Sequence, residues 1–530
     1  MQLKKILLLL LILLMCSCNS NSNDNSPSDE QQNNISAISF IEKTADGKTY
    51  YCLDGKPFMP IGVQIRTDLL LYKENCEFDV IVEMFTKAKE LGVTMVEIPV
   101  PWYATETSEG VYNFRDIGKM MTLAKQLGLK IEFLLFSTNT TGWSDNVPDY
   151  IKNDSDTYSR YISKVSPNGL FLVQNDPDLL DREGKWLNAM MDSIATWSTT
   201  NNDEHVVVSI QIHNESDTFP RFVLSQQQIM MPDNSRRLTD IEAWKETIEA
   251  YDYLGKIVKK SKYPCITRVN LAQAYKGSWE DFTGKIFNLE GIDIVGDDTY
   301  AKTVAFNKEV ILDFNNEVLF NKNNYPHISE NDGSYNTVPS LILSTTAIGG
   351  GYMIYDLATP IIALDEYGWD DWSILNPRTL EYKPHTELTR KVIKGIVMAG
   401  SDYVLANVGD IAAFNVVNDV PQETITQTIQ TSHASITFET KEGALGYVIT
   451  SNEYIDIYFT ASATLKISNV VYENKLYSGS VDLSGIFVEN GLPVEIASDT
   501  FTVEGEQFYR LKVSSVISTL ISNCLENIGG

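Results

Sequence analysis

The sequence predicts a (β/α)8 TIM barrel, an α/β fold, followed by a smaller C-terminal all-β sandwich domain. Two observations lead to this fold class: short β-branched apolar runs alternate with helical patterns, and near Asn407 the rhythm changes to short β-prone runs alone. The alternation fills roughly 350 residues, and a barrel of this kind usually takes about 200 to over 400. An open doubly wound sheet is the alternative, but no glycine-rich phosphate turn follows the first strand to favour it.

The barrel is predicted over residues 37–403. Its eight strands are expected at Met59–Val63, Val93–Val100, Lys130–Phe136, Val206–Ile212, Pro264–Val269, Ile292–Val295, Tyr325–Ile328 and Gly350–Tyr355. Apolar residues that return every three or four positions predict helices at Val80–Leu91, Phe114–Leu127, Ile241–Lys260 and Glu387–Ala399. Because 43% of the 530 residues are hydrophobic, the chain can bury a large core.

The second domain is predicted over residues 404–530. Turn residues separate its β-prone runs, which are Ser435–Glu439, Leu445–Thr450, Ile455–Thr460, Leu465–Val471, Ile486–Val488 and Phe508–Val513. Many short strands with regular turns are typical of a sandwich. Its aromatic residues mostly alternate as core residues would, so a brace for the barrel is preferred over a carbohydrate-binding module.

The first 18 residues read as the signal peptide of an exported lipoprotein. Lys4 and Lys5 precede the apolar run Ile6–Met15, which is about half the ~20 residues that a spanning helix needs. Ser17 directly before Cys18 resembles a lipobox, in which the thiol is acylated. We therefore expect a lipid anchor at the cell envelope, on an outer membrane and facing either side; a plain secretory signal is the alternative. Residues 19–36 are polar and predict a disordered spacer.

Charge and cysteines exclude several classes of function. A net charge of -28 argues against binding of nucleic acid, whose phosphates require clusters of Lys and Arg. No CxxC spacing joins Cys52, Cys76, Cys265 and Cys524, and the histidines lack ligand spacing. We expect neither a metal nor a cofactor. Export permits disulfides, but four cysteines allow three pairings, and free thiols are equally compatible.

Chemistry in a barrel of this kind lies at the C-terminal ends of the strands. The fourth predicted strand leads into Gln211–Ser216 (QIHNES), which places Asn214 and Glu215 side by side, and the seventh leads into Glu330. Hydrolysis of a glycosidic bond with retention needs two carboxyl groups about 5 Å apart. Glu215 and Glu330 are the candidate pair.

These residues resemble the retaining glycoside hydrolases of clan A, especially the β-galactosidase-type families 35 and 42. The likeness covers most of the barrel: Asp54–Phe58 (DGKPF), Gly62–Arg66 (GVQIR), Pro101–Trp102 and Glu109–Phe114 (EGVYNF) are similar to family 35 segments. Gln211–Glu215 stands where that family has Gln-Val-Glu-Asn-Glu, with His213 in place of a Glu. This resemblance implies that the chain is a bacterial lipoprotein that forms an offshoot of the clan.

The resemblance implies a role for each matching residue. Glu215 is the acid/base, Glu330 the nucleophile, and Asn214 binds the sugar near its 2-hydroxyl. The segment Asp298–Tyr300 is similar to another active-site segment. The substrate-binding candidates are Asn214, Arg66, Trp102, Asp298, Tyr300, Tyr335 and Tyr355. Trp143, Trp369 and Trp372 are further aromatic residues in loops, each as compatible with the core as with sugar stacking.

Several alternatives stay open at this level. Glu97 and Glu132 are interpreted as structural carboxylates, and His213 is expected to fill space between strands rather than tune Glu215. The expected partner is a carbohydrate substrate, and galactoside hydrolysis is one option. A catalytically inactive glycan-binding lipoprotein is the rival function. Among enzymes, attack within a glycan chain competes with removal of terminal sugars.

Overall fold

The computed structural model describes residues 37–224, 228–272, 289–305, 324–415, 424–472, 475–480 and 501–513. The predicted signal peptide, the spacer and Cys18 lie outside these residues, as do Cys524 and the strand expected at Ile486–Val488. Residues 37–530 group into one unit, so the expected division into two domains at residue 403 stays a prediction.

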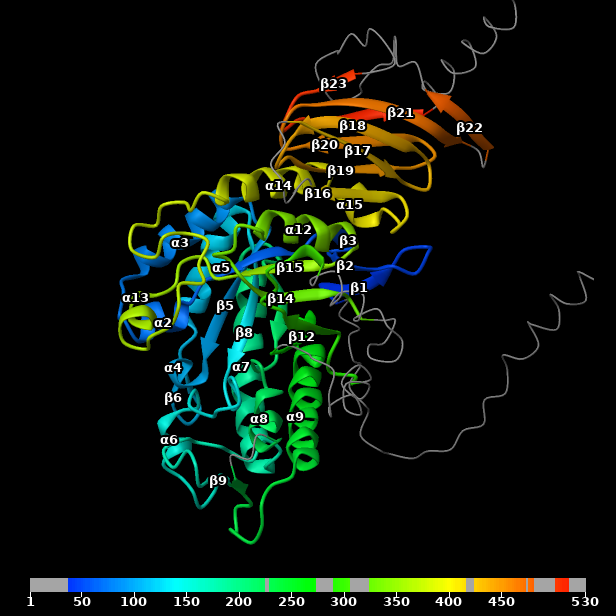
Figure 1. Ribbon diagram of the computed structural model, residues 1–530. Coiled ribbons are helices and arrows are strands. Elements are labelled where there is room, and N and C mark those ends of the chain that lie inside the picture. The colour runs from blue at the N-terminus through cyan, green and yellow to red at the C-terminus, as the bar shows by residue number, and fades with distance from the viewer. Residues whose placement is uncertain are drawn as a thin grey trace, which may run out of the picture. The chain divides into compact units, whose positions relative to one another are not determined.

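Eight parallel strands close into a barrel, as the sequence predicts (Figure 1). In chain order they are β4 (Ile61–Gln64), β5 (Met95–Pro101), β8 (Lys130–Phe136), β10 (Val207–Gln211), β12 (Ile266–Leu271), β13 (Ile294–Asp298), β14 (His327–Asp332) and β15 (Gly351–Tyr355). The barrel closes where β15 pairs with β4. The seventh strand runs four residues past its expected end at Ile328, so Glu330 lies within β14 rather than beyond it.

The long helices of the barrel are α3 (Phe78–Leu91), α5 (Arg115–Leu127), α7 (Pro177–Thr200), α9 (Asp240–Lys260), α12 (Val338–Ala347) and α14 (Thr386–Ala399). Four of them confirm the helices expected from periodicity. The sequence pattern did not reveal α7, which begins with Asp176 accepting hydrogen bonds from the N–H groups of Asp178 and Leu179. Its inward face carries Arg182 and Glu183 beside apolar residues, and this interrupts the apolar stripe.

Short elements fill the connections. The helices are α2 (Thr67–Tyr72), α4 (Trp102–Thr105), α6 (Asp149–Lys152), α8 (Thr218–Leu224), α13 (Ile361–Asp365) and α15 (Ser401–Leu405). The strands are β6 (Glu106–Ser108), β7 (Val111–Tyr112), β9 (Ile162–Ser163) and β11 (Ile229–Met230). No helix among the described residues is long and apolar enough to cross a membrane.

An N-terminal antiparallel sheet covers the end of the barrel where the strands begin. It consists of β1 (Ser39–Lys43), β2 (Thr49–Leu53) and β3 (Lys56–Phe58). The N–H of Ile38 donates to the carbonyl of Pro264 at 2.8 Å, and the Tyr51 hydroxyl donates to the carbonyl of Val208 at 2.9 Å. Val208 lies near the start of β10, so this sheet is opposite the end that carries Glu215.

The C-terminal residues form two antiparallel sheets, as expected for a sandwich. One has the order β16 (Ile411–Asn415), β19 (Leu445–Thr450), β20 (Tyr454–Phe459), β24 (Phe508–Lys512). The other has β17 (Thr424–Gln430), β18 (Ser435–Lys441), β21 (Ala463–Tyr472) and β22 (Lys475–Ser480), with β23 (Phe501–Val503) on β21. Phe414, Phe438 and Phe459 meet between the sheets with ring centroids 4.3 to 5.2 Å apart. The hydroxyls of Tyr447 and Tyr458 donate to carbonyls of α14.

The three described cysteines carry free thiols. Cys52 and Cys265 are buried, and Cys76 is half-buried. The sequence left disulfides and free thiols as alternatives, and these three positions have free thiols.

Candidate active site

Three carboxylates meet at the C-terminal end of the barrel. Glu215 follows β10, Asp298 ends β13, and Glu330 lies on β14. One carboxylate oxygen of each lies within 4.8 Å of the others. The closed barrel brings these strand ends together although the residues are far apart in sequence. We call these three residues the carboxylate cluster.

The backbone around the cluster adopts unusual conformations. His213, Glu215 and Tyr300 have φ angles of 57°, 46° and 43°, in the left-handed region that favours glycine. Each such residue costs about 1–3 kcal/mol and persists only where the surrounding structure holds it in place. The N–H of Glu215 donates to Oδ1 of Asn270 at 2.9 Å, and the N–H of Thr141 donates to the carbonyl of Asn214 at 2.8 Å. These contacts fix the direction in which the Glu215 side chain leaves the strand end.

A network of amides orients Asn214. Its Oδ1 accepts hydrogen bonds from Nε2 of Gln211 at 2.9 Å and from Nδ2 of Asn270 at 3.1 Å. Nδ2 of Asn270 also donates to Oδ2 of Asp298 at 2.8 Å. With its oxygen occupied, Asn214 has its amide N–H groups left to donate, and no partner for them is found among the described residues. The side chain is thus a preoriented donor beside Glu215.

Glu215 has the environment of an acid that holds its proton. Burial, and then the negative charges of Glu330 and Asp217, raise the pKa of Glu215 to about 8. The Thr141 hydroxyl donates to Oε2 of Glu215 at 2.9 Å and opposes this rise. At neutral pH the protonated form therefore predominates.

Glu330 has more hydrogen-bond donors and cations around it than Glu215. The Tyr300 hydroxyl donates to its Oε2 at 2.6 Å, and Nε2 of Gln64 donates to its Oε1 at 3.2 Å. Burial raises the pKa of Glu330 above its usual value, and these two hydrogen bonds, together with the charges of Arg66 and Arg268, oppose the rise without reversing it. Among the cluster's carboxylates, Glu330 is the best supported as an anion. The pKa of Asp298 is raised well above its usual value by burial and then by the charges of Glu330 and Glu215.

Arg66 joins the cluster to aromatic residues. Its guanidinium forms a bidentate ion pair with Asp68, at 2.7 and 2.9 Å, and donates to the Tyr355 hydroxyl at 2.9 Å. The guanidinium carbon also lies 5.1 Å from the ring centroid of Trp369. The Tyr355 and Tyr300 rings meet edge to face, with centroids 6.1 Å apart. Arg66 is thus held in place at the mouth and is 7% exposed.

A buried polar layer lies across the strands below. Nε of Arg268 donates to Glu132 at 2.6 Å, and its Nη2 donates to Glu97 at 2.7 Å. This ion-paired arrangement agrees with the interpretation of both acids as structural. His327 lies in the same layer, and neither ring nitrogen has a partner among the described residues.

Among the residues that the structure describes, two groups have the ligand spacing that a cation would need. They are the carboxylate cluster and the set Glu97, Glu132 and His327. In the second set the Arg268 guanidinium already forms an ion pair with each of the two carboxylates. In the carboxylate cluster, Glu330 uses both oxygens as hydrogen-bond acceptors. The expectation that the site holds no metal stays a prediction that a chelator can test.

The structure corrects the expectation for Trp102. Its side chain is 0% exposed, its ring stacks on Trp186 with centroids 5.5 Å apart, and its indole N–H donates to Glu106 at 2.7 Å. A fully buried ring cannot stack on a sugar, so Trp102 belongs to the core.

His213 also differs from its expected role as a space filler. Its Nε2 lies 2.9 Å from Oε1 of Glu183, and both side chains are buried. Burial raises the pKa of Glu183, but His213 and the hydroxyls of Ser137 and Thr138 outweigh it, so the net change is downward. The pair ties the segment before Asn214 to α7.

Tyr335 has no contact with the carboxylate cluster among the described residues, and its side chain is hydrogen-bonded to Asp332 at the end of β14. It is half-buried against the core, and Nζ of Lys302 lies 5.2 Å from its ring centroid. By contrast, Asn214, Arg66, Asp298, Tyr300 and Tyr355 all join the network around Glu215 and Glu330 described above.

Four contact residues escaped the sequence reasoning: Gln64, Thr141, Glu183 and Asn270. Gln64 and Asn270 follow apolar runs at strand ends, which is a usable signal. Thr141 lies in a loop without a motif. Glu183 lies in the middle of α7, where nothing in the local pattern marks it.

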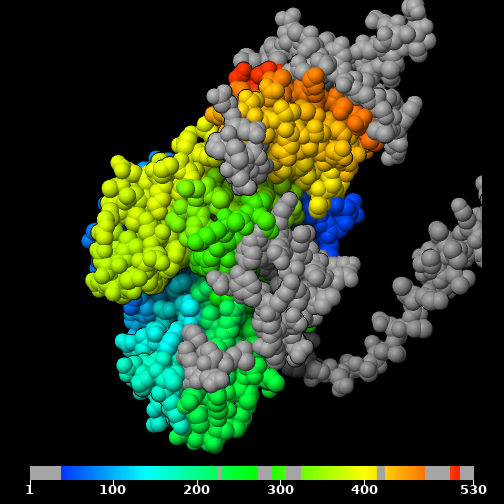
Figure 2. Space-filling model, in the orientation of Figure 1, coloured from blue at the N-terminus to red at the C-terminus, as the bar shows by residue number. Residues whose placement is uncertain are grey.

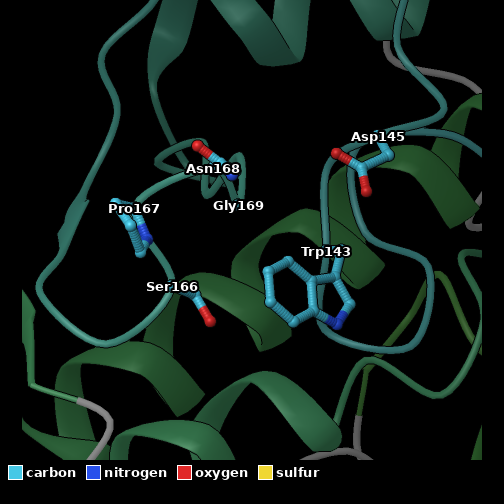
Figure 3. Close-up of a pocket in the computed structure, with 6 residues that line it drawn as sticks. All are labelled: Trp143, Asp145, Ser166, Pro167, Asn168 and Gly169. Atoms are coloured by element: carbon cyan, nitrogen blue, oxygen red, sulfur yellow. The ribbon is translucent and has the colours of Figure 1, made fainter.

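A pocket opens at the loop that follows β8 (Figure 3). It has a volume of about 440 Å³ and is lined by Trp143, Asp145 and residues 166–169. Trp143 is two residues from Thr141, whose hydroxyl binds Glu215. Figure 3 shows the Trp143 ring and the Ser166 hydroxyl turned toward the space between their two segments.

Comparison with known proteins gives the following. Residues 247–421 match a family described as a domain of unknown function (DUF4978). No curated protein matches the chain. The similar solved structures include the following three. An exo-β-1,4-mannosidase from Opitutaceae bacterium strain TAV5 has a TM-score of 0.47 and 13% identity, over 69% of this chain and 62% of that chain. A β-galactosidase from the psychrophilic Marinomonas ef1 has a TM-score of 0.44 and 11% identity, over 65% and 60%. A Thermomonospora fusca β-mannanase, solved in complex with mannotriose, has a TM-score of 0.41 and 13% identity, over 66% and 93%.

The match therefore spans less than two thirds of the length of the first two structures. Similarity this low does not extend to activity. What this chain does has to be argued from its own carboxylate cluster.

Proposed function

We propose that this chain is a retaining glycoside hydrolase that works by double displacement. The observation that supports this most is the pairing of Glu215 and Glu330, whose closest carboxylate oxygens are within 4.8 Å. Retaining enzymes have the two carboxyl groups about 5 Å apart, whereas inverting enzymes need about 6.5–9.5 Å to admit a water molecule. The contrasting surroundings of the two residues support one acid and one nucleophile.

In the first step Glu215 donates its proton to the glycosidic oxygen while an oxygen of Glu330 attacks the anomeric carbon. The bond from that carbon to the leaving oxygen breaks, and an ester between the sugar and Glu330 forms. In the second step Glu215, now ionised, takes a proton from water. The resulting hydroxide attacks the anomeric carbon, the ester bond breaks, and both carboxyl groups return to their first state.

Neighbouring residues have supporting roles in this proposal. The free N–H groups of Asn214 bind a sugar hydroxyl next to the anomeric carbon. Tyr300 and Gln64 keep Glu330 ionised and aimed. Galactose is one option for the sugar that is cleaved, and the identity of the sugar is to be found by assay.

A panel of dinitrophenyl glycosides, with plant and host polysaccharides, tests the activity. A 2-deoxy-2-fluoro glycoside of the hydrolysed sugar should attach covalently to Glu330, as read by mass spectrometry of the peptide. Glu330→Gln should abolish turnover. Glu215→Ala should lower it by about 10²–10⁴-fold, and azide should restore it by forming a glycosyl azide of retained configuration. Glu246→Gln is the matched control, since Glu246 is a buried glutamate on α9 outside the cluster.

Two results would overturn the proposal. One is turnover of wild-type rate in Glu330→Gln, and the other is a product of inverted configuration. Saturable glycan binding without any turnover or labelling would instead support the rival function, a glycan-binding lipoprotein.

The wild-type pH profile gives a further check. Glu215 must be protonated for the first step, so kcat/KM should fall as pH rises through about 8. For a leaving group that needs no protonation, this alkaline decline should vanish.

We also propose that Cys18 carries a lipid that holds the enzyme at the cell envelope. The support is the order of charged, apolar and small residues before Cys18. The polar residues 19–36 would give the enzyme reach from the membrane.

A further inference from the structure

Aromatic rings continue outward from the Glu330 side of the carboxylate cluster. Tyr355, whose ring meets Tyr300, lies 5.8 Å from Trp372, centroid to centroid. Trp372 lies 5.8 Å from Trp369, which lies 6.2 Å from Tyr367. We call Tyr355, Trp372, Trp369 and Tyr367 the aromatic run. Exposure increases along it, from 7% at Tyr355 to 46% at Tyr367.

The aromatic run is held in place rather than free to collapse. The Arg66 guanidinium is fixed by Asp68 and contacts both Tyr355 and Trp369. The backbone N–H of Trp369 donates to the carbonyl of Ala363 in α13 at 2.9 Å. The segment around α13, yellow-green in Figure 2, forms a broad part of the surface. Rigid, partly exposed aromatic faces are suited to stacking on the apolar faces of sugar rings.

The pocket at Trp143 adjoins the loop that carries Thr141, whose hydroxyl donates to Glu215. Phe171 contacts the Trp143 ring with centroids 4.7 Å apart, and a Cβ at Gly169 would lie only 2.1 Å from Cζ3 of that ring. Glycine at 169 thus lets the loop approach the ring and hold it. The pocket volume of about 440 Å³ is within the usual range of ligand sites, about 300–1,000 Å³.

The proposed mechanism indicates which part of the substrate lies near each of these two features, the Trp143 pocket and the aromatic run. Glu215 gives its proton to the oxygen of the leaving sugar, so that sugar lies on the side of Thr141 and Trp143. Glu330 bonds to the sugar that is retained, so the chain attached to that sugar continues on the side of Tyr355.

We infer that the site holds sugar units on both sides of the broken bond, with the Trp143 pocket taking the leaving part and the aromatic run taking the retained part. This rests on the proposed function and deepens it: the substrate is a glycan chain, and cleavage occurs within it. A site that removes single terminal sugars makes no use of ring surfaces on the retained side beyond the first sugar.

Two kinds of substrate separate this inference from the activity itself. Monosaccharide fluorides of galactose, glucose and mannose carry neither a leaving sugar nor a preceding chain. Galacto-, cello- and manno-oligosaccharides of two to six units, labelled with ¹⁸O at the reducing end, occupy both sides, and mass spectrometry reports which bond breaks. Rates are measured for the wild type, Trp143→Ala, Trp369→Ala and the control Trp197→Ala, a half-buried tryptophan on the outer helix α7.

In the wild type, kcat/KM should rise with chain length, and internal bonds should break first. Trp143→Ala and Trp369→Ala should each lower kcat/KM for the hexasaccharide by about tenfold, with little change for the fluoride. Trp197→Ala should change neither.

Three results would overturn the inference. Release of terminal monosaccharides alone, at rates independent of chain length, shows that the enzyme is active but not chain-cleaving. Equal losses on fluoride and hexasaccharide in both variants show that the rings are structural. No turnover of any probe overturns the proposed function, and the inference with it.

Discussion

Replacing Glu330 with Gln should lower the pKa of Glu215. The wild-type pKa of about 8 arises from burial first and from the Glu330 charge second. The substitution keeps the size and the burial of the site but removes the charge. Glu215 should therefore lose its proton at a lower pH in the variant.

The size of the change follows from Coulomb's law. At the 4.8 Å that bounds the separation of the two carboxylates, two like charges in an effective dielectric of about 20 repel by about 3.5 kcal/mol, or about 2.5 pKa units. Because the pKa of Glu330 is raised as well, Glu330 carries only part of its charge in the lower part of the titration. The expected fall in the pKa of Glu215 is thus about 2 units.

Carbon-13 NMR of side-chain carboxyl groups measures this without any turnover. The Glu215 signal is assigned by its loss in Glu215→Gln and titrated in the wild type and in Glu330→Gln. Glu83→Gln, an exposed position on α3, is the control and should leave the titration unchanged. A Glu215 pKa that stays near 8 in Glu330→Gln would refute the assignment of a charge-coupled pair and leave burial as the whole cause.

Three further predictions concern other parts of the chain. Tyr300→Phe removes a hydrogen bond that lowers the pKa of Glu330, so the acid limb of kcat/KM should move to higher pH by about 1–2 units, as a pH-rate profile would show. Arg268→Met leaves buried carboxylates without their cation and should lower the free energy of unfolding by about 3–5 kcal/mol in urea titrations. Cys18→Ser should release the chain from the membrane fraction of a bacterial host, whereas Cys16→Ser should not.

Each of these has a result that contradicts it. A Tyr300→Phe profile with an unmoved acid limb would mean that the hydrogen bond does not govern the charge of Glu330. Arg115→Met is the stability control, since the Arg115 side chain is 73% exposed. Equal stability of the Arg268 and Arg115 variants would show that the buried ion pairs contribute nothing. Release by both cysteine variants, or by neither, would remove the assignment of Cys18.

The barrel strands were predictable because they are buried on both faces. Such strands are short, continuous apolar runs, and all eight were found in sequence. The seventh extends past its expected end because its last residues are polar. Glu330, Asn331 and Asp332 point to partners near the strand ends, and no apolar pattern records such contacts.

Helix α7 shows the limit of periodicity in another way. Its inward face binds His213 through Glu183, and Glu106 through Arg182. Charged residues that are buried because they are paired look like solvent-facing residues in sequence. The pairing becomes visible only when the strand and the helix are placed together.

The candidate site was most readily predictable where its residues are neighbours in sequence. Asn214 and Glu215 are adjacent, so a local motif announces them. Their support from Thr141 and Asn270 comes from neighbouring strand ends and has no motif. The prediction that Trp102 binds the sugar was wrong. A ring beside a strand end can turn into the core as readily as toward the substrate, and the sequence does not show which direction it takes.

The N-terminal sheet has a consequence for how a glycan would reach the carboxylate cluster. Together with the hydrogen bond from Ile38 to Pro264, it covers the end of the barrel where the strands begin. A long polymer would therefore enter and leave at the opposite end, where Glu215 and Glu330 lie.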